Sequence, residues 1–268
     1  MTIEKTTAYV LKTLPYRESS GIFHLMTENH GLIHGIAKGI RKKKTSASFL
    51  ERGFLIETLL YVKPHRDLCI LGDVCILNFF PKTRVSLIGN AVRDAMFEMV
   101  LATVSTGHPY PELFQVLTLF LGFLENNNNS FPKPILLWKF YHEFASIMGF
   151  GFNLANCIIC QRTMSDLTGG YLVIEKGGLV CEGCAQKKDT GYFVQKQALE
   201  YLNPALMSFK TTEGPQFSLL EVRRLTRLFA SYCQYHCDSC FEHKALAFLD
   251  SLLVCDVFES RTLQAKAI

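Results

Sequence analysis

Four cysteines arranged as two pairs are the residues of this sequence best suited to chemistry. Cys157 and Cys160 form one Cys-x-x-Cys motif, and Cys181 and Cys184 form another. A tight turn lets both thiolates of one motif reach the same ion, and two motifs supply the tetrahedral set of four sulfurs that Zn²⁺ favours, with Zn–S distances of ~2.3 Å. We therefore predict one structural Zn²⁺ bound by these four residues. An iron–sulfur centre and a redox dithiol are the alternatives.

The segment between the two motifs must bring them together. It reads GGYLVIEKGGLV, with β-forming residues on both sides of Lys176, Gly177 and Gly178, which predicts a hairpin. Four thiolates leave no open coordination position for water, so the predicted site is structural. A zinc-dependent nucleobase deaminase is excluded, because that class has a proline before its second cysteine pair and this chain has Val180.

Motifs for other catalytic chemistry are missing from the sequence. It contains no phosphate-binding loop GxxxxGK(S/T), no dinucleotide fingerprint GxGxxG and no nucleophile elbow GxSxG. Together with a closed metal site, this predicts a protein that binds a partner and is not an enzyme.

A run of cations follows the third β-rich segment of the chain. Lys38 precedes it, and Arg41, Lys42, Lys43 and Lys44 are adjacent in the stretch KGIRKKKTS. The first 80 residues contain eleven Lys or Arg against seven Asp or Glu, and so hold the whole net charge of +4. Cations that neutralise phosphates release counterions, so an exposed basic loop can bind DNA or RNA. A solvated loop that aids solubility is the alternative.

The first 80 residues read as β-structure. Five runs rich in Val, Ile, Thr and aromatic residues are separated by turn signals. In order, they are TTAYVLKTL, GIFHLMT, GLIHGIA, GFLIETLLYV and LCILGDVCILNFF. Five strands with a long connection after the third suit a closed barrel of the oligonucleotide/oligosaccharide-binding (OB) type; an unrelated sheet or sandwich is the alternative. Tyr9, Tyr16, Phe23 and Phe49 are available to stack bases or to fill the core.

After Pro81 the apolar residues recur at helical spacing. We predict an α+β multidomain protein with an OB-fold domain over 1–80, a helical domain over 81–156 and 187–268, and a zinc-binding insert over 157–186. The apolar stretch Leu113–Leu124 falls short of the ~18 residues that a membrane span needs and reads as a buried helix.

Six further cysteines lie outside the two motifs. We expect them to be core residues, which is the common state of free cysteine: Cys69, Cys75, Cys233, Cys237, Cys240 and Cys255. A second metal site is the alternative for Cys233, Cys237 and Cys240, because His236 and His243 are interleaved with them.

The first twenty residues carry acidic and polar side chains where a signal peptide has a continuous apolar region. A long chain with ten cysteines and no secretion signal favours reduced thiols and metal ligands over disulfides. We expect a cytoplasmic protein.

Three features in order give the chain a family resemblance: the segment YRESSGIFHLMTENHGLIHGIAKGIRKKK, the paired Cys-x-x-Cys motifs, and a helical end reading HKALAFLDSLL. Together they resemble RecO, the bacterial recombination mediator family, over nearly the full chain. Some RecO proteins lack the four cysteines, so zinc is not the source of the activity the family shares.

The resemblance implies a fold, a set of site residues and a set of partners. It implies an N-terminal OB-fold, a helical domain and a zinc-binding insert, with Lys38 and Arg41 to Lys44 in the basic OB-fold stretch and the four cysteines as zinc ligands. Such proteins bind single- and double-stranded DNA and anneal complementary strands. They associate with RecR and with the C-terminal tail of single-stranded DNA-binding protein, and they help to load RecA in the pathway that includes RecF. A bacterial location at the nucleoid when bound to DNA follows. A zinc-ribbon interaction adaptor without DNA contact is the alternative function.

Overall fold

The computed structural model describes eight segments of the chain: residues 2–40, 50–62, 68–126, 133–163, 166–186, 191–202, 217–237 and 242–265. The chain divides into two compact units. Unit 1 comprises Met1–Ser86 and Met99–Glu125, and unit 2 comprises Leu87–Glu98 and Asn126–Ile268. The finer domain boundaries given above stay a prediction.

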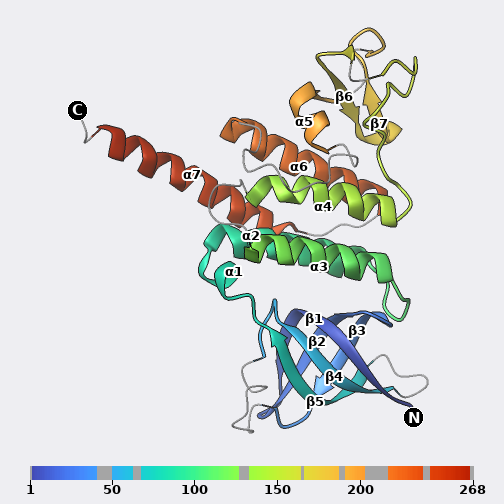
Figure 1. The fold of residues 1–268 in the computed structure, drawn as a ribbon, viewed down its shortest axis with the longest axis vertical. Coiled ribbons are helices and arrows are strands. Elements are labelled where there is room, and N and C mark those ends of the chain that lie inside the picture. Colours follow the sequence, from blue (N-terminus) through green and yellow to red (C-terminus); the bar gives the residue numbers. More distant parts are fainter. Residues whose placement is uncertain are drawn as a thin grey trace. The chain divides into compact units, whose positions relative to one another are not determined.

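Unit 1 contains a closed five-stranded barrel (Figure 1). Its strands are β1 (Thr2–Tyr16), β2 (Ser20–Thr27), β3 (Gly31–Ala37), β4 (Leu55–Val62) and β5 (Leu68–Asn78). They are hydrogen-bonded in the order β1-β2-β3-β5-β4, and β4 closes the barrel by pairing with β1. The β3–β5 pair is parallel and the other pairs are antiparallel. The predicted OB-type barrel is confirmed.

Alternation along the strands separates the barrel core from its surface. In β2 and β4 every second residue is buried, as expected for strands with one face toward a core. A register shift between Val10 and Lys12 of β1 marks a bulge. The barrel core is formed by buried side chains from all five strands and the segments that follow β3 and precede β4: Ala8, Val10, Phe23, Leu25, Ile33, Ala37, Ile40, Leu50, Phe54, Ile56, Leu60 and Leu71.

Two helices belong to unit 1 beside the barrel. They are α1 (Pro81–Val85) and α3 (Pro111–Asn126), and α3 buries one apolar face, which confirms the predicted buried helix. Tyr9 of β1 packs on Phe114 of α3 and donates a hydrogen bond to Thr118 Oγ1 at 3.1 Å. The Glu125 carboxylate at the end of α3 accepts the backbone N–H groups of Lys82 and Thr83, so it caps the start of α1.

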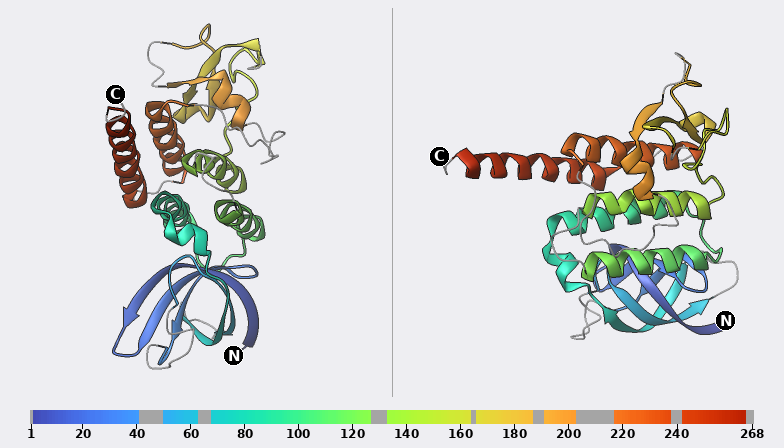
Figure 2. Two further views of the ribbon diagram at one scale, coloured as in Figure 1. Left: turned by 60° about the vertical axis from the view of Figure 1, so that its left-hand side comes forward. Right: turned by 45° about the horizontal axis from the view of Figure 1, so that its top comes forward.

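Unit 2 contains a helical core and a small sheet. Its helices are α4 (Lys133–Ile147), α5 (Lys196–Leu202), α6 (Leu219–His236) and α7 (Lys244–Ala265), and α2 (Leu87–Thr103) begins in this unit. Helices α4 and α6 lie side by side (Figure 2). Trp138 of α4 is fully buried and donates its indole N–H to Thr226 Oγ1 at 2.8 Å. A capping box formed by Ser218 and Glu221 starts α6.

The small sheet contains β6 (Gly169–Val173), β7 (Gly178–Val180) and β8 (Tyr192–Gln195) in the order β7-β6-β8. A 3₁₀ turn, Ile174–Lys176, joins β6 to β7, and Gly177 adopts a φ of 70°. This is the hairpin predicted between the cysteine motifs. Within the described residues, no helix combines the length and apolarity needed to cross a membrane.

Candidate metal centre and nucleic-acid interface

The four predicted metal ligands lie together beside the small sheet. The sulfurs of Cys157, Cys160, Cys181 and Cys184 are all within 4.8 Å of one another. Sulfurs placed 2.3 Å from a central ion at the corners of a tetrahedron would be about 3.8 Å apart, and the Cys160–Cys181 separation is 3.7 Å. The cluster can therefore hold a metal ion.

Local backbone bonds shape the two cysteine turns. In the first turn Gln161 adopts a φ of 61° and donates its N–H to the Cys157 carbonyl at 2.9 Å. In the second turn the N–H groups of Cys184 and Ala185 donate to the Cys181 carbonyl at 3.0 Å. These tight turns place both thiols of each motif on the same side, which is the reason for the two-residue spacing.

Electrostatics in the cluster favour a bound cation. Burial by itself would raise the pKa of the Cys157 thiol, but N–H groups of Cys160, Cys181 and Ile159 donate to its sulfur and lower that pKa to about 6. The pKa of the Cys184 thiol is raised to about 12, chiefly because it shares hydrogen bonds with the sulfurs of Cys181 and Cys160. One thiolate forms readily and the last one resists ionisation, so a bound dication, by offsetting part of the negative charge, would favour ionisation of all four thiols.

The metal cluster is joined to the helices of unit 2 through the hairpin. Ile158, inside the first cysteine turn, donates its N–H to the Leu179 carbonyl of β7 at 2.9 Å. At the hairpin tip, His236 of α6 donates from Nε2 to the Ile174 carbonyl at 2.8 Å, which assigns the proton to that nitrogen. The Tyr232 hydroxyl donates to the Phe150 carbonyl at 2.9 Å. We call the two cysteine turns and the β6–β7 hairpin the ribbon. A metal that orders the ribbon would therefore also order the surface of α6 that contacts the hairpin.

The remaining described cysteines range from buried to exposed, with Cys69 and Cys237 half-buried. Cys233 is fully buried in α6 and donates its thiol to the Tyr141 carbonyl at 3.5 Å, as expected of a core residue. The prediction for Cys75 is wrong: it lies on the exposed outer face of β5. Within the part of the chain that the structure describes, the four-cysteine cluster is the sole group of three or more potential metal ligands. Cys240 lies outside that part.

The predicted DNA-binding residues are described only in part. Lys38 directly follows β3 and is exposed. Arg41, Lys42, Lys43 and Lys44 lie outside the described residues. Of the candidate stacking residues, Tyr9 and Phe23 are buried and Tyr16 is exposed, while Phe49 lies outside the described residues. The Arg17 guanidinium lies over the Tyr16 ring, 5.3 Å from its centre.

The outer face of β1, β2 and β3 carries polar residues that were not singled out from the sequence. Lys12, His24 and His34 occupy matching register positions on these three strands. The sequence predicts that these residues alternate with core residues along each strand, but it does not predict the bulge that aligns Lys12 with His24. In OB-folds generally, the surface formed by the second and third strands binds oligonucleotides. The corresponding strands here are β2 and β3.

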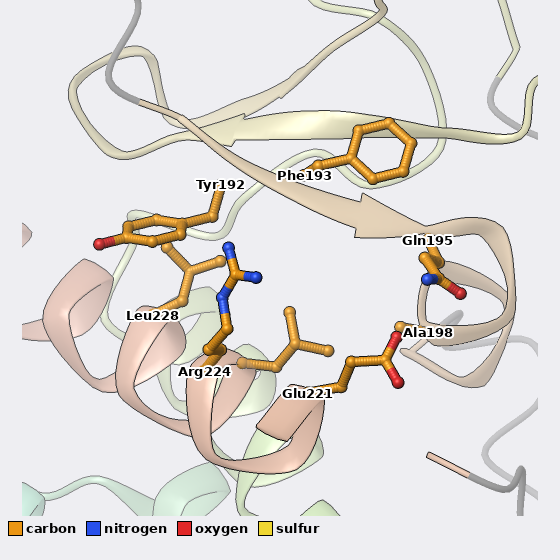
Figure 3. Close-up of a pocket in the computed structure, with 8 residues that line it drawn as sticks. Tyr192, Phe193, Gln195, Ala198, Glu221, Arg224 and Leu228 are labelled. Atoms are coloured by element: carbon orange, nitrogen blue, oxygen red, sulfur yellow. The ribbon is translucent and has the colours of Figure 1, made fainter. Parts of the chain in front are cut away.

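A second surface feature lies in unit 2, between β8 and α6 (Figure 3). It is a cavity of about 150 Å³ lined by aromatic and aliphatic side chains together with Gln195, Glu221 and Arg224. The Arg224 guanidinium lies 5.7 Å from the centre of the Tyr192 ring. The cavity thus combines apolar surface with one cation, Arg224, and one anion, Glu221.

The fold and site define a class: a multidomain protein with an OB-type barrel and a four-cysteine ribbon carried by a helical unit. Comparison with known families gives two matches that agree with this class. Residues 1–80 match the model described as Recombination protein O N terminal, and residues 84–244 match Recombination protein O C terminal. The chain belongs to the RecO family of DNA repair and recombination proteins.

Individual relatives agree. The chain is similar to the DNA repair protein RecO of Syntrophobacter fumaroxidans, with 32% identity over 182 residues, covering 68% of this chain and 71% of that protein. It is also similar to the DNA repair protein RecO of Chlorobium luteolum, with 27% identity over 267 residues, covering 94% of this chain and 99% of that protein. The similarity extends through both compact units, so a role in DNA repair and recombination applies to the chain as a whole.

Proposed function

We propose that this protein is a recombination mediator that binds single- and double-stranded DNA and anneals complementary strands. In this proposal it also acts with RecR, and in the pathway of RecF, to load RecA onto DNA coated by single-stranded DNA-binding protein. The observation that carries the proposal is the closed barrel. The second and third strands of OB-folds bind oligonucleotides, and in this sequence β3 is followed by Lys38 and the cationic run Arg41 to Lys44.

The proposed mechanism is electrostatic. Two DNA strands repel each other through their phosphates, and a basic surface that neutralises both lowers this repulsion while base pairing supplies the annealing energy. Lys38 and Arg17 are exposed at the ends of β3 and β1. With the adjacent run Arg41 to Lys44, they would provide contacts that are independent of base sequence.

We propose that the four-cysteine cluster holds one structural Zn²⁺. Cys157, Cys160, Cys181 and Cys184 supply four thiolates and leave no open coordination position, so the ion would fold the ribbon and perform no catalysis. The protein is then a binding protein and not an enzyme.

The cavity between β8 and α6 supports an interaction with the tail of single-stranded DNA-binding protein. An acidic, partly apolar peptide end needs an apolar depression with a neighbouring cation, and Tyr192, Leu228 and Arg224 provide both (Figure 3). Glu221 is the one anion of the lining, and its carboxylate accepts the Ser218 hydroxyl and N–H in the capping box of α6. Recruitment through this cavity would bring the annealing surface to coated DNA.

An annealing assay tests the proposed function. Complementary oligonucleotides, one labelled with a donor and one with an acceptor fluorophore, are coated with single-stranded DNA-binding protein and mixed with the zinc-loaded protein. We expect annealing to accelerate, and to accelerate further with the intact tail than with a tail-truncated coating protein. Equal rates with and without the protein would refute annealing.

The alternative function is a zinc-ribbon adaptor without DNA contact. The exposed side chains of Ile159 and Tyr192 favour a protein partner at the ribbon. A gel-shift assay on single-stranded DNA separates the two functions, because an adaptor would leave the DNA unshifted.

A further inference from the structure

Two histidines stack on the outside of the barrel. His24 of β2 and His34 of β3 are direct partners across the antiparallel pair, and their ring centres are 4.1 Å apart with an interplanar angle of 42°. Lys12 of β1 is the partner of His24 on its other side. The three side chains form one row across β1, β2 and β3, which we call the basic row.

Strand alternation and the β1 bulge turn the basic row outward. Phe23 and Leu25, the neighbours of His24, both lie in the barrel core, so the His24 side chain points to the opposite face. Both histidines are half-buried and Lys12 is exposed. A ligand in solvent can therefore reach all three.

The groups that face the histidines are basic or apolar. From β1, His24 faces Lys12, and from β3 it faces His34; on β5, the partner of His34 is the uncharged Leu68. Burial lowers the pKa of His24 to about 4, with smaller contributions from the charges of His34 and Lys12. His24 is consequently neutral at pH 7. Protonation of His24 would add a positive charge to a row that already contains the Lys12 side chain.

An anion on the row would remove this repulsion. A phosphate accepts hydrogen bonds from imidazolium and ammonium groups and offsets their charge, so it raises the pKa of a histidine that it contacts. Tyr16 at the end of β1, Arg17 directly after it and Lys38 directly after β3 are also exposed, which gives an extended ligand further contacts. A nucleic-acid backbone has both the phosphates and the length to use them.

We propose that Lys12, His24 and His34 form a phosphate site for a nucleic-acid backbone, and that binding there is coupled to uptake of a proton. This proposal rests on the proposed DNA-binding function and adds a surface to it that lies outside the cationic run Arg41 to Lys44.

The coupling has a calculable size. If a bound phosphate returns the pKa of His24 from about 4 to its ordinary value of ~6.5, affinity rises about fourfold between pH 8 and pH 6. The sign follows from linkage, because the complex binds the proton more tightly than the free protein and lower pH favours it.

The test measures single-stranded DNA affinity by fluorescence anisotropy at pH 6 and pH 8, at constant ionic strength. The variants are the double substitution His24→Gln with His34→Gln and, as a matched control, His108→Gln, which removes an exposed histidine of the same unit. We expect the control to keep the fourfold pH effect and the double variant to lose it. A double variant with the wild-type pH effect would overturn this inference and leave the DNA-binding function standing. A wild-type protein that binds no DNA at either pH would overturn both.

Nuclear magnetic resonance of the wild-type protein tests the same inference without substitution. The His24 ring protons should show a neutral ring down to pH 5 in the free protein and a titration midpoint near ~6.5 with an oligonucleotide bound. Inorganic phosphate at the same phosphate concentration should leave the ring neutral. An unchanged midpoint with the oligonucleotide, or an equal change with inorganic phosphate, would overturn the assignment to a nucleic-acid backbone.

Discussion

Replacing Cys157 by serine should destabilise the ribbon more than it weakens DNA binding. Cys157 is fully buried, and its sulfur accepts hydrogen bonds from the N–H groups of Ile159, Cys160 and Cys181. A serine hydroxyl can accept the same three bonds, but as a neutral group and not as a thiolate. The barrel belongs to the other compact unit. The DNA affinity of the variant molecules that remain folded should therefore change little.

The size of the effect follows from these three bonds. Hydrogen bonds to a charged group contribute about 1.5–3 kcal/mol and neutral ones about 0.5–1.5 kcal/mol, so three bonds weaken by about 3 kcal/mol in total. Loss of one metal ligand adds to this. For a chain of this size, each kcal/mol lowers the unfolding temperature by roughly 2–4 °C, which gives a decrease of at least about 6 °C.

Three measurements check this prediction: metal content by mass spectrometry, thermal unfolding by circular dichroism, and DNA affinity. Cys75→Ser is the matched control, since Cys75 is exposed on β5 and outside the cluster; it should behave as wild type in all three. A Cys157→Ser protein that retains one zinc per chain and the wild-type unfolding temperature would refute the metal site. Unchanged stability with strongly reduced DNA affinity would instead indicate a direct contact between ribbon and DNA.

Three further changes test the supporting structure. Thr226→Val leaves the buried Trp138 indole N–H without its acceptor and should cost about 1–3 kcal/mol of unfolding free energy in a denaturant titration, whereas Thr226→Ser should retain most of the stability. His236→Phe removes the hydrogen bond to Ile174 and should speed hydrogen exchange at the hairpin tip; unchanged exchange would show that the bond does not hold it. Burial opposes ionisation of Glu125, but its hydrogen bonds outweigh burial and lower its pKa. Glu125→Gln should therefore lower the unfolding temperature at pH 7, and its difference from wild type should vanish as the pH falls through the lowered pKa; a difference that persists in acid would contradict this.

The sequence predicts the metal cluster and the individual strands of the barrel well because both depend on local spacing. Two Cys-x-x-Cys turns and a short hairpin bring the four sulfurs together through contacts between residues close in the sequence. Similarly, the five β-rich runs are local signals of strands, whereas the closure of the barrel depends on pairing between β4 and the distant β1. Buried cysteines in α6 are equally predictable, since an apolar helix face is periodic and Cys233 lies on it.

Features that depend on pairing between distant segments are harder to predict. The β1 bulge that places Lys12 beside His24 is a property of strand register, and no residue type near Val10 predicts it. Cys75 was expected in the core because it lies in an apolar run, but β5 has one exposed face and Cys75 is on it. The cap on α1 from Glu125 joins residues 42 and 43 positions apart, which only the folded chain reveals.

The salt dependence of single-stranded DNA affinity tests the central claim most directly. Wild-type protein and a variant with alanine at Arg41, Lys42, Lys43 and Lys44 are compared from low to high salt in a logarithmic plot of affinity against salt concentration. If the cations neutralise phosphates, the slope should become shallower by about 0.7 for each phosphate that is no longer neutralised, or about 2.8 for all four, with a weaker affinity for every DNA sequence tested. Equal slopes and equal affinities for the two proteins would contradict an electrostatic role for this run.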